Sequence, residues 1–195
     1  MLALEMRYPL AFLLAVATGA TAHAKPATRY HFELAEVTLA PSAPAELSVK
    51  ARSVFTDLTA ARPEVVQTLE NPPDPAKDAT AYRKYLDARG VRAFALKVKI
   101  DQYDRALGPT KQPGKTGNVL TIHLNVTLVG SQIPGDALAL AGSGGSTVMA
   151  EVGETLRPRE EEMAMDDALK DALGHALDDA IAKLKAPKKP AGKKK

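Results

Sequence analysis

The chain has 195 residues, of which 26 are basic and 23 acidic, and it contains no cysteine. This length suits one domain, and the lack of cysteine excludes disulfides, thiolate metal sites, a cysteine nucleophile and lipoprotein-type acylation. The net charge of +3 comes from a lysine-rich C-terminal end, so the rest of the chain is slightly acidic. A basic folded surface for nucleic acid is not indicated, and we expect no nucleic-acid partner.

Residues 1–24 have the three parts of a secretory signal peptide. Arg7 supplies a basic start, residues 10–17 are apolar, and the segment ends in Ala22-His-Ala24. The apolar run is shorter than the about 20 residues that a membrane-spanning helix needs. We therefore expect cleavage after Ala24, a periplasmic or secreted bacterial protein, and no transmembrane segment after cleavage. Translation starts at Met1 or at Met6, which gives a more compact signal.

A single domain is expected over residues 25–185, and its first half alternates strands with helices. Ser42 is a candidate N-cap for the first helix, and Gly90 stands where a C-terminal cap of the second belongs. The elements, assigned from apolar periodicity, are a strand at 30–39, a helix between Ser42 and Arg62, a short strand at 65–69, and a helix from Ala76 or Ala79 to Arg89.

The second half is a strand meander closed by a long helix. Residues 142–146, a Gly/Ser run, are expected to interrupt the last strand. The elements are strands at 93–100 and 120–128, a turn at 133–136, strand segments at 137–141 and 147–152, and a helix from Pro158 to Leu184. Residues 186–195 contain only Lys, Pro, Ala and Gly, and are expected to be a disordered tail.

This order predicts an α+β fold, a two-layer α/β sandwich with a mixed sheet. A βαβα unit precedes an antiparallel meander and the C-terminal helix. Each of the three amphipathic helices needs an apolar partner surface, so we expect the helices on one face of the sheet. The opposite face of the two clearest strands is polar and is expected to stay open. It supplies the candidate partner-binding residues Lys97, Lys99, His123, Asn125 and Thr127.

The motifs that would indicate catalysis are not found in the sequence. The run Gly142–Thr147 lacks the Lys-Ser/Thr pair of a phosphate loop and does not match the nucleophile elbow of serine hydrolases. Asp171 and His175, spaced i,i+4 on the last helix, are a candidate pair of ligands for a divalent ion. The alternative, which we favour, is a solvated acidic helix face. We expect no cofactor and no enzymatic activity.

The lysine-rich tail has two interpretations. It is either a solubilising end without a specific role, or an electrostatic tether to anionic envelope lipid or polymer, worth ~1 kcal/mol per lysine near a charged surface. The lysines concerned are Lys188, Lys189, Lys193, Lys194 and Lys195.

The order of elements resembles a family of small bacterial envelope domains. The resemblance rests on the helix-Gly-strand passage Tyr82–Ile100, the meander to Val152 and the Ala-rich closing helix Met163–Leu184. It is to the domain shared by the curli-secretion protein CsgG, the penicillin-binding-protein activator LpoB and the N-terminal domain of TolB, and it covers about residues 30–184. The resemblance implies a domain that works by contact, with no catalytic residues. Many members carry a lipid-bearing cysteine that this chain lacks.

These observations predict an exported, non-enzymatic envelope module. We expect its open sheet face to bind an envelope protein or an anionic envelope polymer or lipid. One alternative is a hydrolase or metal-dependent enzyme whose site is assembled only in three dimensions. A deep pocket with acidic groups and a histidine would favour it. A second alternative is a carrier of a small ligand, which needs a cavity beneath the helices.

Overall fold

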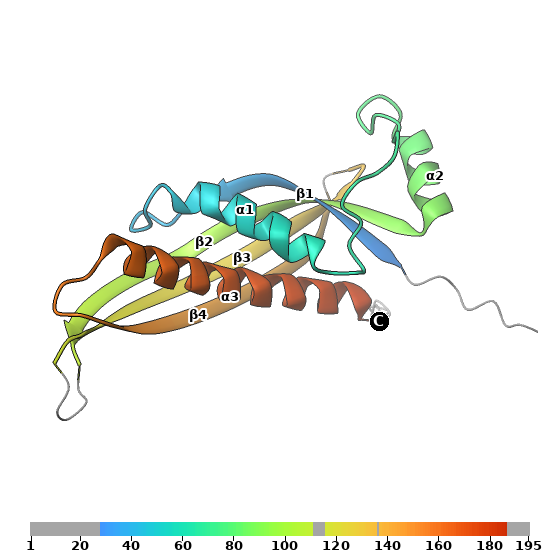
Figure 1. The fold of residues 1–195 in the computed structure, drawn as a ribbon. Coiled ribbons are helices and arrows are strands. Elements are labelled where there is room, and N and C mark those ends of the chain that lie inside the picture. The colour runs from blue at the N-terminus through green and yellow to red at the C-terminus, as the bar shows by residue number, and fades with distance from the viewer. Residues whose placement is uncertain (1–27, 111–115, 136, 187–195) are drawn as a thin grey trace, which may run out of the picture.

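The structure is a computed structural model that describes residues 28–110, 116–135 and 137–186 (Figure 1). The predicted signal peptide and the tail lysines Lys188 to Lys195 lie outside these residues. The elements are β1 (Arg29–Thr38), α1 (Leu47–Ala60), α2 (Ala79–Arg89), β2 (Val91–Pro109), β3 (Asn118–Ile133), β4 (Leu138–Val152) and α3 (Pro158–Lys185).

The four strands form one mixed sheet in the order β1-β2-β3-β4. β1 and β2 are parallel, because α1 and α2 carry the chain back to the same end before β2 begins. β2, β3 and β4 are antiparallel neighbours joined by short connections. α1 and α3 lie together along one face of this sheet (Figure 1). The α+β class and the open sheet are thus confirmed.

The main core lies between the sheet and these two helices. Alternate residues of β2 and β3, such as Leu96, Ile100 and Leu124, are fully buried there, as expected from a two-residue period. α3 contributes a row of small residues. Ala172, Ala176 and Ala180 are each 0% exposed and lie over β4.

β4 is continuous through residues 142–146, so the predicted interruption of this strand is wrong. Gly142 and Gly144 face α3, and a Cβ atom on either would collide with helix backbone, at Ala176 and Ala172 respectively. Glycine normally weakens a strand, but it also marks places where another backbone approaches closely. Here the glycines allow the alanine row of α3 to pack directly on the strand.

α2 does not follow the expected placement of every helix on one face. Tyr82 and Leu86 of α2 pack with Val91 and Ala93 in a second, smaller cluster. These two β2 residues alternate with Phe94 of the main core and therefore point to the opposite side of the sheet. α2 lies at the end of the sheet, beyond α1 (Figure 1). The rest of that sheet face stays uncovered.

Two local predictions in the first half are corrected. Residues 65–69 are not a strand, because only Val65 pairs with Tyr30 in an isolated bridge. Ser42 does not cap α1. Its hydroxyl donates instead to the backbone carbonyl of Tyr103 at 2.8 Å, and Glu46 stands at the N-cap position. The cap of α2 is confirmed, since Gly90 has a left-handed φ of 62°.

Candidate functional site

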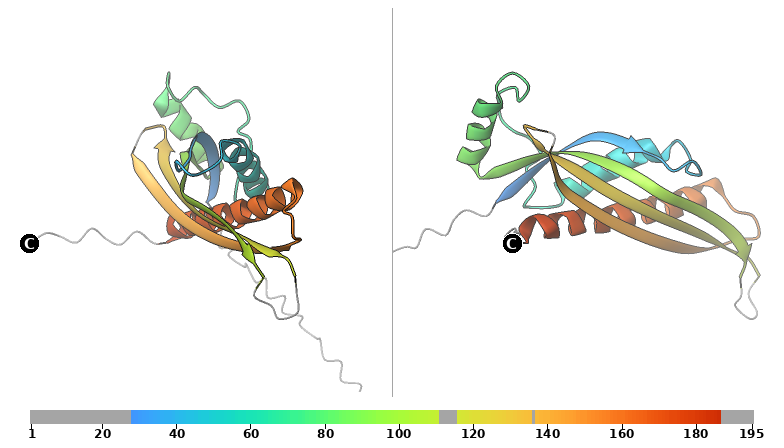
Figure 2. Two further views of the ribbon diagram at one scale, coloured as in Figure 1. Left: turned by 90° about the vertical axis from the view of Figure 1, so that its left-hand side faces the viewer. Right: turned by 180° about the vertical axis from the view of Figure 1, so that it is seen from behind.

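The five predicted binding residues lie on the sheet face that α1 and α3 leave uncovered, which we call the open face. In the reverse view of Figure 2, β2 and β3 lie in front of α1. Lys97 is paired with Glu36 at 2.8 Å, and Lys99 with Asp101 at 2.8 Å. The side chains of the two lysines are 65% and 64% exposed. Both ammonium groups therefore meet solvent, although each already has a carboxylate partner.

The other three predicted residues belong to two hydrogen-bonded sets on this face, one across β2, β3 and β4 and one between β2 and β3. Asn125 donates to the Gln102 side-chain oxygen at 2.9 Å, and His123 Nδ1 lies 2.8 Å from the Thr147 hydroxyl. The Asn125 amide also contacts the His123 ring within β3, where Asn125 Nδ2 is 3.2 Å from His123 Nε2. Thr127 donates to Asp101, which links it to Lys99. The structure thus joins Lys99 to Thr127 and His123 to Asn125.

Asp101 and Gln102 are members of these two sets that the sequence analysis missed. The register between β2 and β3 shifts between Ile100 and Gln102, which is a β-bulge. Both residues turn to the open face as a result, and after the bulge Tyr103 points to the helix side. The signal in the sequence was the end of strict alternation after Ile100, with two polar residues in succession.

The open face is acidic in the part that the structure describes. Beyond the end that α2 covers, it carries five carboxylates and two lysines: Glu33, Glu36, Asp101, Asp104 and Glu151, with Lys97 and Lys99. Hydrogen bonding to Glu36 raises the pKa of Lys97. Burial acts to raise the pKa of Asp101, but the hydrogen bonds from Lys99 and Thr127 outweigh it, so the pKa of Asp101 is lowered. These groups are charged at neutral pH.

The candidate metal ligand His175 lies against the outer edge of β4. Its Nδ1 is 3.3 Å from the Gly145 carbonyl. One helical turn further, Asp179 accepts from the Ser143 backbone N–H at 3.0 Å, and after another turn Lys183 donates to the Ala141 carbonyl at 3.1 Å. Residues i, i+4 and i+8 of α3 therefore bond to the edge strand, which would otherwise offer its backbone to another chain. Among the described residues no group of three His, Asp or Glu side chains is placed to hold a metal ion.

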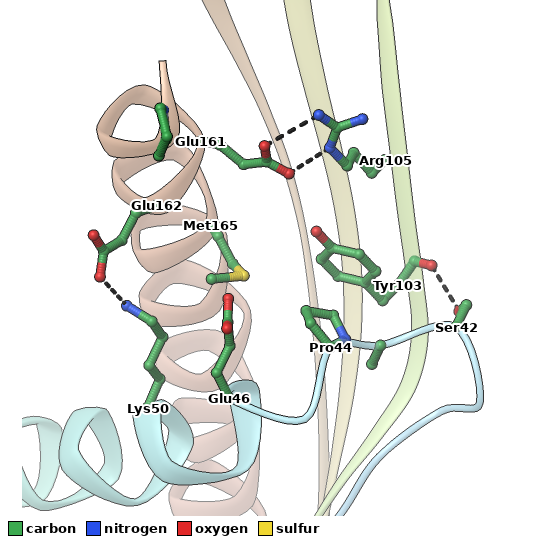
Figure 3. A pocket seen from close by; sticks show the side chains of 11 residues that line it. Ser42, Pro44, Glu46, Lys50, Tyr103, Arg105, Glu161, Glu162 and Met165 are labelled. Carbon is green, nitrogen blue, oxygen red and sulfur yellow. Dashed lines mark hydrogen bonds and ion pairs between the residues drawn. The ribbon is translucent and has the colours of Figure 1, made fainter. Parts of the chain in front are cut away.

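A cavity of about 670 Å³ lies on the helix side of the sheet, between the loop into α1, the start of α3 and β2 (Figure 3). Its walls hold two sets of ion pairs. Arg105 pairs with Glu161, and Lys50 pairs with Glu162 at 2.9 Å and with Asp166 at 2.7 Å. No histidine is among the described lining residues. The cavity gathers acidic groups but lacks the histidine that the enzyme alternative expected.

No family model matches the sequence, and no curated protein matches it. Among solved structures, the chain is similar to a neuraminyllactose-binding hemagglutinin homolog from Helicobacter pylori, with 11% identity, a TM-score of 0.50, and coverage of 96% of this chain and 94% of that chain. A looser match is a minor lipoprotein from Acinetobacter baumannii, with 11% identity, a TM-score of 0.37, and coverage of 83% of this chain and 96% of that chain. Another is rare lipoprotein B from Shewanella oneidensis, with 10% identity, a TM-score of 0.35, and coverage of 76% of this chain and 96% of that chain. At these identities the likeness concerns the fold alone.

The comparisons therefore define the fold and leave the family open. Two of the solved structures are bacterial lipoproteins by name, and the resemblance to the CsgG, LpoB and TolB domains stays a prediction. None of the helices in the described part of the chain is long and apolar enough to cross a membrane.

Proposed function

We propose that this chain is an exported, non-enzymatic binding module of the bacterial envelope, and that the open face is its partner-binding surface. The observation that carries the proposal is the two hydrogen-bonded sets of side chains that join β2, β3 and β4 on an uncovered sheet face. Ordering side chains at an interface costs free energy. Side chains already held by one another lose less on binding, so this face suits recognition by contact.

The predicted signal peptide supports export. The similar fold from Helicobacter pylori, whose name refers to binding rather than to catalysis, supports a binding role. That protein's ligand is not transferred to this chain. Neuraminyllactose carries a carboxylate, which the carboxylates of the open face would repel. We therefore propose a different ligand for this chain than the neuraminyllactose in that protein's name.

The charge of the open face favours one class of partner, an envelope protein with a basic surface. Five carboxylates outnumber two lysines on the described face. Lys97 and Lys99 are each engaged with a carboxylate. An anionic polymer or lipid would have to break those pairs and would meet a face with more carboxylates than lysines. The tether function of Lys188 to Lys195 stays a separate prediction.

Site-directed photocrosslinking of the full chain in its own host tests the surface. A photoreactive residue replaces Thr121 or Thr147 on the open face and, as the control, Val49, which is 70% exposed on α1. We expect a discrete protein adduct from the two open-face positions and none from position 49. An adduct of equal yield from position 49 would refute the placement.

Binding of the identified partner to charge-neutralised variants tests the chemistry. Asp101→Asn with Asp104→Asn keeps the side-chain size, and Glu70→Gln with Asp87→Asn is the matched control on exposed acids near α2. Surface charge pairs are worth on the order of 1 kcal/mol each at contact in water, so we expect affinity to fall about tenfold or more in the first variant only. Unchanged affinity, or binding to a lipid or polymer instead of a protein, would overturn the proposal.

A further inference from the structure

The cavity on the helix side is separate from the open face, because the bulge after Ile100 turns Tyr103 to the opposite side of β2. Tyr103 is 7% exposed and lines the cavity. Its hydroxyl points into the cavity in Figure 3 and has no hydrogen-bond partner among the described residues. A buried tyrosine hydroxyl usually has a partner, and no fully buried side-chain nitrogen or oxygen of the described residues lacks one, so solvent reaches this hydroxyl in the cavity. This one is therefore available to a bound molecule.

A second unpartnered group lies at the solvent-exposed rim of the cavity, at the start of α1. Glu46 points toward Met165 in Figure 3, and its carboxylate has no ion-pair or hydrogen-bond partner in the described chain. The other carboxylates at the cavity wall form ion pairs: Glu162 and Asp166 with Lys50, and Glu161 with Arg105. Since Lys50 alone faces both Glu162 and Asp166, the site as a whole has an excess of negative charge.

The walls between these polar groups are partly apolar. Pro44, Met165 and the Tyr103 ring line the space beside Glu46. Such a combination, a few polar groups in a concave and partly apolar surface, is typical of small-molecule sites. A positively charged group can approach Glu46 while a short hydrocarbon body contacts Met165 and Pro44.

From this geometry we propose that the cavity binds a small organic ammonium ion, with its cationic group at Glu46, a hydrogen bond to the Tyr103 hydroxyl and its hydrocarbon part against Met165. The hydroxyl remains protonated at neutral pH, because burial and then the nearby Glu161 raise the pKa of Tyr103.

An anion is the competing ligand class, because the N-termini of two helices lie at this cavity and helix N-termini attract negative charge. Five of the backbone N–H groups there already have backbone acceptors. Leu47, Ser48 and Val49 of α1 donate to the preceding turn, and Glu160 and Glu161 of α3 donate to the Arg157 carbonyl. At the start of α3 the Glu160 carboxylate already accepts from the Arg157 backbone N–H, and Glu46 adds negative charge at the start of α1.

Methyl NMR of the methionines tests the site in the full chain. Met165 lines the cavity, while Met149 lies on β4 with its side chain on the open face and serves as an internal control. The probes are n-butylammonium, n-butanol and butyrate, which share a hydrocarbon body and differ in charge. We expect n-butylammonium to shift the Met165 signal saturably and to leave Met149 unchanged, with n-butanol about tenfold weaker or more and butyrate inactive.

Two conservative variants identify the groups responsible. Glu46→Gln should weaken n-butylammonium binding about fivefold, as for loss of one charge pair near a protein surface. Tyr103→Phe, which keeps the ring, should weaken it about threefold to tenfold, as for loss of one hydrogen bond. The control Glu70→Gln should bind like the parent chain.

Three results would overturn the proposal: a Met165 shift with butyrate, equal shifts with all three probes, or no shift with n-butylammonium. Full affinity in Glu46→Gln would also overturn it. Because these readouts concern the helix side, their failure would leave the proposal for the open face intact, and failure of the crosslinking test would leave this one intact.

Discussion

The contact between β4 and α3 leads to a sharp prediction about Gly144. Substitution Gly144→Ala adds one methyl group directly under the helix. That atom would lie within 3.0 Å of the Ala172 carbonyl oxygen, the Ala176 nitrogen and the His175 Cβ. Two of these are backbone atoms, which have no alternative rotamer, so the strain can be relieved only by moving α3 away from the sheet.

The cost follows from what that movement separates. α3 buries ten residues, among them Ala168, Leu169, Leu173 and Leu177. A gap of about 0.5–1 Å forfeits a quarter to a half of each affected dispersion contact. Overpacking usually costs about 1–3 kcal/mol, and we expect the upper end here, about 3 kcal/mol. For a domain of this size that corresponds to a fall in Tm of about 6–12 °C.

Urea unfolding followed by circular dichroism measures this loss. Gly108→Ala is the matched control, because a methyl group there meets nothing within 4 Å. We expect the control to be neutral or stabilised by about 0.4–1 kcal/mol through the unfolded state. If Gly144→Ala loses less than about 0.5 kcal/mol, well below the usual cost of overpacking, the close approach of α3 to β4 is wrong.

Three further predictions concern caps, charges and the sheet edge. Gly90→Ala should lower the unfolding free energy by about 1–2 kcal/mol, because its φ of 62° is left-handed; a neutral result in urea unfolding would contradict this. The hydrogen bond from Lys185 lowers the pKa of Glu64 from 4.5, so its charged form stabilises the fold above pH 4.5 and this contribution disappears as the pH falls through the lowered value. Glu64→Gln should therefore flatten the urea midpoint between pH 6 and pH 3, and an unchanged profile would refute the pairing. Asp179→Ala with Lys183→Ala uncovers the edge of β4 and should cause concentration-dependent self-association, measured by light scattering; a variant that stays as monodisperse as the parent would contradict edge protection.

Local patterns were sufficient for most of the elements. The 3.6-residue period of α3, the two-residue period of β3 and the glycine after α2 each reflect interactions between near neighbours in sequence. Burial of one face of each strand also follows from these patterns, and so did the polar open face with Lys97, Lys99, His123, Asn125 and Thr127. Whether this face binds a partner stays a prediction, because exposure by itself does not name a ligand.

The errors occur where a distant segment decides the local structure. The Gly run at 142–146 reads as a break, since glycine disfavours strands, but α3 lies over it and makes glycine necessary. Residues 65–69 have strand-like composition, yet only Val65 meets an edge with which to pair. The bulge at Ile100 depends on the register with β3, and that register changes which face Tyr103 occupies.

By itself the sequence determined the α+β class, the amphipathic helices and the wet side of the sheet, because periodicity and capping act over a few residues. The tertiary structure alone decided that α2 packs on the other side at the sheet's end, that α3 bonds the free edge of β4, and that Tyr103 and Glu46 share a cavity. Each of these joins residues from different elements. The bonds between α3 and β4, for example, join residues 30 to 42 positions apart in the sequence. Such contacts are selected by the packing of whole elements, and no local pattern encodes them.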